Sequence, residues 1–199
     1  MMWCQRRVEL RTRPLDRLVL RRAAQRYAGQ GWDVVPGACL SGAQFYCDEM
    51  GCPTTACHPA LADWEAAASH CRDRVDAWWG RLHHGVLLVT GRAFDVLEIG
   101  DPWGEVIAAQ ADGPVAVSPA GRWMFLVRPG APLSRDLADH SGVVLHGKGS
   151  WIPAPPTRLP DGRVRWRVAP DRSDWRPGDP YLVQQLATRA LDGRVDQAC

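Results

Sequence analysis

The stretch that decides the fold lies in the middle of the chain, Val86-Leu87-Leu88-Val89-Thr90-Gly91-Arg92-Ala93-Phe94-Asp95-Val96-Leu97-Glu98-Ile99-Gly100. The apolar run at residues 86–90 ends at a glycine, which predicts a short buried strand. Residues 94–99 predict a second strand, because aromatic and β-branched residues dominate and a glycine follows. Two adjacent buried strands of this kind favour a sheet with helices packed on it.

The flanking sequence extends this pattern in both directions. Apolar residues at helical spacing predict a helix over residues 15–27, which Gly29 ends. A hairpin is predicted around the turn at residues 119–121. Further helices are expected at residues 60–68, 74–81, 104–111, 133–139 and 181–191, and further strands at 32–36, 143–146 and 163–168. The predicted class is α+β, with a central mixed or antiparallel sheet flanked by helices.

Length and composition are those of one ordinary domain. The chain has 199 residues, of which 46% are hydrophobic and 23% charged, so a disulfide-stapled mini-protein and wholesale disorder are both excluded. Residues 1–14 are expected to form a basic N-terminal arm, and residues 15–199 a single domain. No apolar run approaches the ~20 residues that cross a bilayer. The N-terminus lacks a secretory pattern, and a cytoplasmic protein without membrane contact is expected.

The charge balance is nearly neutral, with a formal net charge of +2, and does not by itself indicate a nucleic-acid-binding protein. The type of cation is more informative. Lys148 is the single lysine among 24 basic residues, and arginine suits bidentate contacts to phosphate. GC-rich codon usage is the plainer explanation.

A cysteine-rich loop at residues 38–59 predicts a structural zinc site. Zinc takes four nitrogen or sulfur ligands in a tetrahedron, and the loop offers Cys39, Cys47, Cys52 and His58, with Cys57 as the alternative to its histidine neighbour. Two other readings stay open. The cysteines can be reduced and pack as small apolar side chains, or one can act as a nucleophile, although no base is specified by the pattern.

Arg163, Arg165 and Arg167 alternate along a predicted strand, which places them on one face and Trp166 on the other. Such a basic stripe can follow a nucleic-acid backbone while exposed aromatic rings stack on bases. The alternative is an edge strand that its charges keep from aggregating.

The order of motifs resembles the Prim-Pol domain, the bifunctional DNA primase/polymerase of the archaeo-eukaryotic primase superfamily. The similarity covers about residues 17–190. It is carried by Gly31-Trp32-Asp33-Val34-Val35-Pro36-Gly37, the cysteine-rich loop ending in His58-Pro59, Trp78-Trp79, Val89-Thr90-Gly91, the acid-bearing strand at residues 94–99, the hairpin at 119–123 and Gly147-Lys148-Gly149-Ser150-Trp151-Ile152-Pro153-Ala154-Pro155-Pro156.

The resemblance implies an RRM-like, primase/polymerase-type sheet and nucleotidyl transfer assisted by two Mg²⁺ or Mn²⁺ ions, which need several carboxylates close together. Glu98 matches the family's first acid. The second falls at Gly100, with Asp101 one residue late and Asp95 on the other face of the strand. The family's phosphate-binding histidine falls at Trp123 and its last acid at Val144.

The catalytic candidates are therefore Asp95, Glu98 and Asp101 in a degenerate site. Arg122 and Lys148, near the family's substrate-facing hairpin and turn, are candidates for gripping phosphate. The resemblance implies a nucleotide or single-stranded DNA as ligand, and a helicase or replication protein as a partner in trans. The alternatives are a non-catalytic nucleic-acid-binding module and a protein–protein adaptor with structural zinc. Without the resemblance, Asp95 and Glu98 are ordinary surface and turn residues.

Overall fold

The structure is a computed structural model that describes residues 14–47, 49 and 52–193. Its helices are α1 (Pro14–Ala28), α2 (Trp64–Ala67), α3 (Arg72–Trp78), α4 (Trp103–Ala108), α5 (Arg135–Ala138), the 3₁₀ helix η1 (Pro170–Ser173) and α6 (Pro180–Asp192). Its strands are β1 (Val34–Gly37), β2 (Cys39–Ser41), β3 (Gln44–Tyr46), β4 (Gly85–Val89), β5 (Asp95–Gly100), β6 (Val115–Val117), β7 (Arg122–Val127), β8 (Val143–His146), β9 (Trp151–Pro153), β10 (Arg158–Leu159), β11 (Gly162–Arg163) and β12 (Arg165–Val168).

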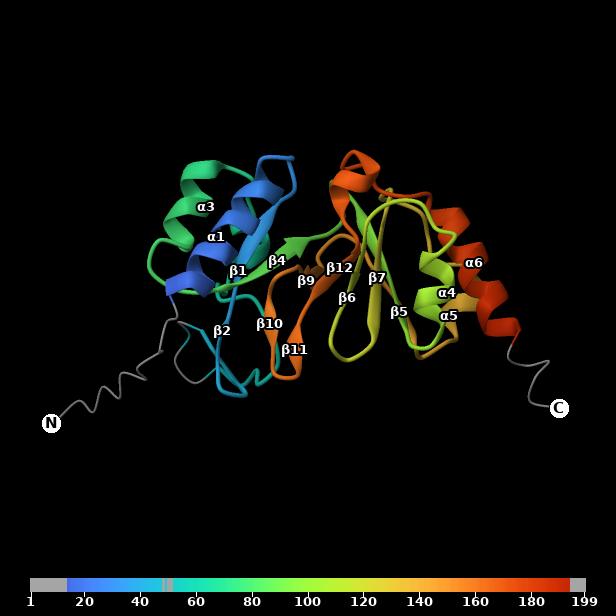
Figure 1. Ribbon diagram of the computed structural model, residues 1–199, viewed down its shortest axis with the longest axis horizontal. Coiled ribbons are helices and arrows are strands. Elements are labelled where there is room, and N and C mark those ends of the chain that lie inside the picture. Colours follow the sequence, from blue (N-terminus) through green and yellow to red (C-terminus); the bar gives the residue numbers. More distant parts are fainter. Residues whose placement is uncertain (1–13, 48, 50–51, 194–199) are drawn as a thin grey trace, which may run out of the picture.

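Two antiparallel sheets organise the chain, and each carries one of the two central strands. The first has the order β1-β4-β9, and the second has the order β12-β6-β7-β5-β8. In Figure 1 the first sheet lies with α1 and α3 in one half of the molecule, and α4, α5 and α6 cover the second sheet in the other half. The α+β prediction with helices flanking antiparallel strands is confirmed.

Alternation along β5 separates two apolar cores. Val96 belongs to a core that also contains Leu20 and Tyr27 of α1 and Leu88 of β4. Its neighbour Leu97 belongs to a second core, with buried residues of α4 and α6. One face of the five-stranded sheet is therefore packed by α4, α5 and α6, and part of the other face is covered by the first half of the chain.

The sequence missed two short hairpins. The strands β2 and β3 pair within the cysteine-rich loop, and β10 pairs with β11 at residues 158–163. The strand predicted at residues 163–168 is therefore split between β11 and β12, with the buried Val164 between them. The predicted basic arm lies outside the described residues except for Pro14, where α1 begins. Within the described ranges, no helix is both long and apolar enough to span a bilayer.

Candidate functional site

Glu98 lies on β5, between β7 and the edge strand β8 of the five-stranded sheet, and points away from the helices α4 and α6. Its partners directly across the neighbouring strands are Met124 of β7 and Val144 of β8. Residues that face each other across strands have side chains on the same face. Arg122 and His146, two residues farther along these strands, therefore share the face of Glu98.

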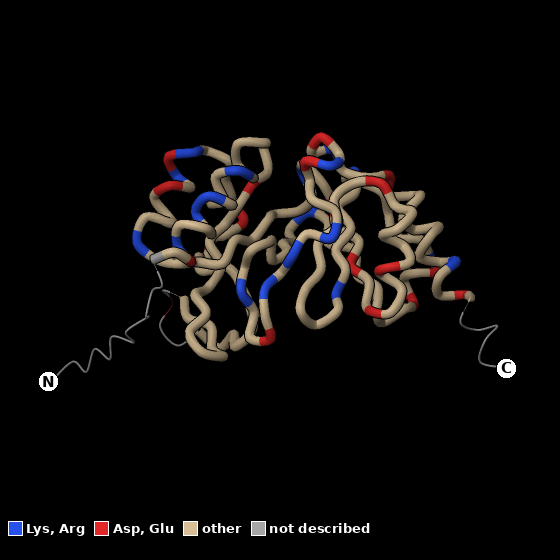
Figure 2. The backbone as a smooth tube through the Cα atoms, viewed as in Figure 1, with Lys and Arg blue, Asp and Glu red and all other residues tan. Residues whose placement is uncertain are grey.

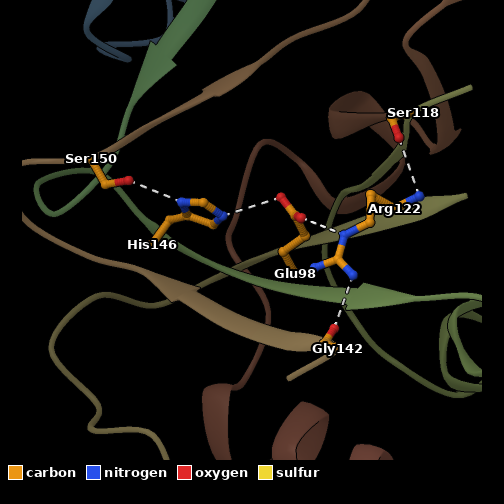
Figure 3. A network of polar contacts seen from close by, with 6 residues as sticks. All are labelled: Glu98, Ser118, Arg122, Gly142, His146 and Ser150. Atoms are coloured by element: carbon orange, nitrogen blue, oxygen red, sulfur yellow. Dashed lines mark hydrogen bonds and ion pairs between the residues drawn. The ribbon is translucent and has the colours of Figure 1, made fainter. Parts of the chain in front are cut away.

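These side chains form one network around the Glu98 carboxylate (Figure 3). Arg122 Nε lies 2.6 Å from Glu98 Oε1, and His146 Nε2 lies 3.1 Å from Glu98 Oε2. Arg122 Nη1 also donates to the Gly142 carbonyl oxygen at 3.1 Å, and His146 Nδ1 lies 2.9 Å from Ser150 Oγ. Both carboxylate oxygens of Glu98 are thus occupied by nitrogen donors of this chain.

The surroundings stabilise the ionised form of Glu98. Burial alone would raise the pKa of this carboxyl, but hydrogen bonds from His146 and Arg122 and the charge of the guanidinium outweigh it, so the pKa lies below its ordinary value. The side chains of Glu98 and His146 are 18% and 19% exposed, which limits the water available to replace these partners.

Asp95 lies on the opposite face of β5 from Glu98. It pairs in register with Val127, whose side chain is in the core beneath α6. Its Oδ2 accepts a hydrogen bond from the Gly130 backbone N–H at 2.8 Å. Its buried Oδ1 has no hydrogen-bond partner within the described ranges. Asp95 therefore holds the loop after β7, and the structure does not bring it to Glu98.

Asp101 makes its hydrogen bonds away from both Glu98 and Asp95. Its Oδ1 accepts a hydrogen bond from Trp123 Nε1 at 2.6 Å, and its backbone N–H donates to the Gly121 carbonyl oxygen at 2.9 Å. Trp123 faces the core of α4 and α6, because it pairs with Ile99 rather than with Glu98. A Cβ on Gly104 would lie 2.0 Å from the Trp123 ring, so only glycine lets α4 approach this closely. Asp101 therefore connects the turn between β6 and β7 to the start of α4.

The three predicted carboxylates therefore do not form a site for Mg²⁺ or Mn²⁺. Such hard cations need several oxygen ligands around one point, and the side chains of Asp95, Glu98 and Asp101 are bound to three different groups. The apolar Val144 stands directly across from Glu98. The residues present do not fit a two-metal centre, and Arg122 stands beside the carboxylate instead.

Of the two predicted phosphate-binding residues, one forms an ion pair within the protein and the other is exposed to solvent. Arg122 is committed to Glu98, whereas Lys148 is exposed on the turn after β8. This turn is fixed against the end of β4. Thr90 Oγ1 donates to the Gly147 carbonyl oxygen at 2.5 Å, and a Cβ on Gly91 would lie 2.3 Å from the Lys148 Cα. Only glycine permits that contact at φ +92°.

A second polar cluster beside this turn was not predicted as a site. The buried Asp33 accepts from His70 Nδ1 and from Arg92 Nη1, each at 2.7 Å. The His70 and Arg92 side chains are 55% and 72% exposed, so their remaining nitrogen atoms face solvent. Asp33 stands within the quoted Gly-Trp-Asp motif, which was a signal, but its two partners lie 37 and 59 residues away.

The three arginines of the predicted basic stripe do not lie on one surface. Arg163 on β11 pairs with Asp16 of α1 at 2.7 Å, whereas Arg167 on β12 lies 3.5 Å from Glu105 of α4. Arg165 pairs in register with Val117, which places it on the α4 side of the sheet and away from Glu98. Figure 2 shows basic residues along β10, β11 and β12 in the middle of the molecule. The structure does not bring the three arginines together in one stripe, because β11 ends at Arg163 and β12 begins at Arg165.

The cysteine-rich loop brings three potential metal ligands together. One ligand atom each from Cys47, Cys52 and His58 lies within 4.8 Å of the others. His58 Nδ1 is 2.7 Å from the Ala56 carbonyl oxygen, and its Nε2 is 3.5 Å from Cys52 Sγ. An imidazole that donates through Nδ1 keeps the Nε2 lone pair for a metal, which is the usual arrangement of a ligating histidine.

The other two cysteines of the loop lie elsewhere. Cys39 is buried at the start of β2, and its Sγ is 3.5 Å from Nδ1 of His84. The structure therefore does not bring Cys39 into the cluster of Cys47, Cys52 and His58. Cys57 packs against Val35 and Leu87, and this burial raises its pKa to about 12. Of the neighbouring pair 57 and 58, the histidine joins the cluster.

Comparison with known proteins identifies the family to which the chain belongs. No curated protein matches it. The sequence profile of the family "Bifunctional DNA primase/polymerase, N-terminal" matches residues 24–180, which include both sheets, the cysteine-rich loop and the Glu98 network. Because the match extends over well more than half of the chain, this protein belongs to the bifunctional DNA primase/polymerase (Prim-Pol) family.

Proposed function

We propose that this protein is a Prim-Pol domain that binds single-stranded DNA or a nucleotide during replication, with polymerase activity that is lost or greatly weakened. Family membership supports the ligand class. The loss of activity rests on one observation, which is that Arg122 and His146 occupy both oxygens of Glu98.

The charges around Glu98 disfavour catalysis by two cations. Nucleotidyl transfer by two cations needs a cluster of negative oxygens, which attracts the metals and holds them against the substrate. Here the carboxylate is neutralised by a guanidinium, and the other two acids are bound to Gly130 and Trp123. The positive charge of Arg122 would repel a divalent cation that approached this carboxylate.

Several cations stay exposed near the network and support the binding of a ligand that carries phosphate. Lys148 and Arg92 lie on two turns that contact each other, and His70 is anchored beside them through Asp33. Exposed arginine and lysine side chains at a turn can contact the phosphates of a nucleotide or of a strand. Arg165 is exposed on the opposite face of the sheet and has no ion pair within the described part of the chain, so it is a candidate for a separate phosphate contact.

A structural zinc ion in the loop is part of the same proposal. Two thiolates and an imidazole suit zinc better than a hard cation, because soft sulfur ligands select it. Cys47, Cys52 and His58 would hold the ion, with a water molecule or a further side chain in the fourth position. Its contribution would be to fix the loop between β3 and α2.

A replication role for a domain with a silent catalytic centre requires a partner that supplies the missing activity. A helicase or another replication protein acting in trans is the partner that the family relationship favours. Nothing in the binding argument requires this partner, so ligand binding can be tested on the protein alone.

Two measurements on the purified protein, with zinc supplied, test the proposal. Template-directed incorporation is assayed on primed and unprimed single strands with Mg²⁺ and with Mn²⁺, and Glu98→Ala serves as the control. Binding of labelled single-stranded DNA and of nucleoside triphosphates is measured in parallel. We expect binding without incorporation. Incorporation that disappears in Glu98→Ala would overturn the assignment of a silent centre, and absence of binding to both ligands would overturn the assignment of a binding domain.

A further inference from the structure

A cavity of about 320 Å³ lies where α1 meets β12 and the segment around η1, away from the Glu98 network. Its walls include Tyr27, Trp166 and Trp175, and its rim includes Arg22 and Arg26 of α1. Trp166 is in register with Ala116, which pairs with Met124 and through it with Glu98. The buried Ala116 and Met124 therefore separate this cavity from the catalytic region.

The aromatic walls are rigid. Tyr27 packs edge-to-face against Trp166 and Trp175, with ring centroids 6.1 and 6.3 Å apart. The Trp166 indole N–H donates to the Tyr27 hydroxyl at 3.0 Å, and that hydroxyl donates to the Pro155 carbonyl oxygen at 2.6 Å. Each of these hydrogen bonds fixes a ring orientation. Flat apolar surfaces are thus presented without the entropy cost of ordering them on binding.

The backbone around Trp175 is strained. Asp174 and Trp175 adopt φ values of 50° and 61°, a region that bulky side chains avoid because of steric clash. The contacts that hold Trp175 there are its packing on Trp32, at 5.1 Å between centroids, and a hydrogen bond from its backbone N–H to the Pro170 carbonyl oxygen. Strain of this kind persists where the surroundings fix a residue, and it is common at binding sites.

The rim carries the charge. The guanidinium of Arg26 lies 5.1 Å from the Trp175 ring centroid and pairs with Asp171 at 3.1 Å. Arg22 is exposed one helical turn earlier and has no ion pair within the described ranges. A flat apolar site with a free guanidinium at its mouth suits a planar ring that carries an anionic group.

We propose that this cavity holds one base of a single-stranded nucleic acid, or of a free nucleotide, against Trp166 and Trp175, with its phosphate at Arg22. The size agrees, because ligand sites begin at roughly 300 Å³, and this cavity admits one ring system and its sugar. Proline-rich peptides also use aromatic grooves, but they do not need a cation at the rim. The inference rests on the proposed single-strand binding and adds the place where a base is held.

The test compares a labelled single-stranded oligonucleotide with one of equal length that carries several abasic sites. Stacking of one base is worth roughly 5- to 150-fold in affinity, so the full-length protein should bind the abasic strand more weakly by a factor in this range. Ala23→Leu, which fills the cavity without removing an aromatic ring, should abolish the difference. Arg22→Ala should lower the salt dependence of binding by about one phosphate contact. The matched control is Arg189→Ala, an exposed arginine on α6, which should change neither.

Each outcome has a definite meaning. A wild-type protein that binds both strands equally, or an Ala23→Leu variant that still distinguishes them, overturns the inference while single-strand binding stands. Absence of binding to any strand overturns the proposed function itself. A free nucleoside monophosphate that competes in the wild type and not in Ala23→Leu identifies the nucleotide as the source, and a base effect without competition identifies the strand. A third outcome would identify a peptide as the ligand and overturn the inference. In that case, the protein binds a proline-rich peptide, Ala23→Leu removes this binding, and the normal and abasic strands bind equally.

Discussion

Arg122 Nε lies 2.6 Å from Oε1 of Glu98, on the sheet face where the family resemblance places the first catalytic acid. The arginine comes from β7, next to the hairpin of residues 119–121, so a neighbouring strand supplies the positive charge that a bound cation would otherwise contribute. The pair converts a position suited to a metal ligand into a structural ion pair. Its energetic role can be measured separately from any enzymatic assay.

Arg122→Met should lower the free energy of unfolding by about 1–3 kcal/mol, because the remaining carboxylate loses a charged partner in a place where water is restricted. Chemical denaturation measures this loss. The matched control is the same substitution in a Glu98→Gln background, where the cost should be clearly smaller. Equal costs in both backgrounds would show that the arginine stabilises the fold through its hydrogen bond to the Gly142 carbonyl oxygen, and not through Glu98.

The same carboxylate should make the protein sensitive to acid. The pKa of Glu98 in the folded protein lies below its ordinary value of 4.5, so its ionised form stabilises the fold fully above about that pH. This contribution is lost as the pH falls through the lower, folded-state pKa. The difference in stability between wild type and Glu98→Gln should therefore shrink between neutral pH and pH values below 4.5. A difference that is constant with pH would contradict the depressed pKa.

The sequence predicts strands and helices here better than it predicts partners. Local spacing is sufficient for α1, β4, β5 and α6, because each is an apolar pattern complete within a few residues. The partners of Glu98 come from positions 24 and 48 residues away, and nothing in the local pattern of Arg122 or His146 indicates that they meet at one carboxylate. His146 read alone is an isolated histidine. It acquires a role only because β8 pairs with β5 in the register that aligns Val96 with it.

The cysteine loop illustrates the same limit at shorter range. Spacing identifies a candidate metal loop and two of its cysteines, but it cannot choose between Cys57 and His58 or exclude Cys39. The choice follows from burial. Cys39 lies in the β2–β3 hairpin that the sequence missed, and Cys57 packs in an apolar cluster. Its apolar surroundings raise the pKa of the Cys57 thiol, and such a thiol is a poor source of the thiolate that zinc requires.

The zinc content of the protein should depend on Cys47, Cys52 and His58 and not on Cys39 or Cys57. Purified wild-type protein is expected to carry about one equivalent of zinc by elemental analysis, and either Cys52→Ser or His58→Ala should remove most of it, because three ligands leave no redundancy. The controls Cys39→Ala and Cys57→Ala alter the same loop and should retain the metal. Loss of zinc in the controls as well as in the ligand variants would show that packing of the loop, not the cluster at Cys47, decides binding.

Asp33 should be the residue whose loss most disturbs the turn that carries Arg92. Asn at this position keeps the shape but removes the charge that orients both His70 and Arg92, and two charged hydrogen bonds around a buried acceptor are together worth roughly 3 kcal/mol. Denaturation of Asp33→Asn should show a loss of this order, whereas Arg92→Ala should cost less because that side chain is largely exposed. A larger loss for the arginine variant would contradict the central position of Asp33.

A carboxylate placed across from Glu98 should restore affinity for divalent cations. Val144 stands directly opposite Glu98 on β8 and is 39% exposed, so an aspartate there is tolerated and brings its Cβ within about 5.5 Å of that of the glutamate. Titration calorimetry with Mn²⁺ should detect binding to Val144→Asp that the wild type lacks. The size-matched Val144→Asn supplies the control without charge.

Adding Arg122→Ala to Val144→Asp should strengthen Mn²⁺ binding further, because the guanidinium no longer neutralises Glu98. The arginine and the metal compete for one carboxylate, so the combined effect of the two substitutions on Mn²⁺ affinity should exceed the sum of their separate effects. Should the double variant bind Mn²⁺ no better than Val144→Asn does, the Glu98 face would lack the geometry of a cation site. The proposed loss of catalysis would then have to be attributed to the strand register and not to the arginine.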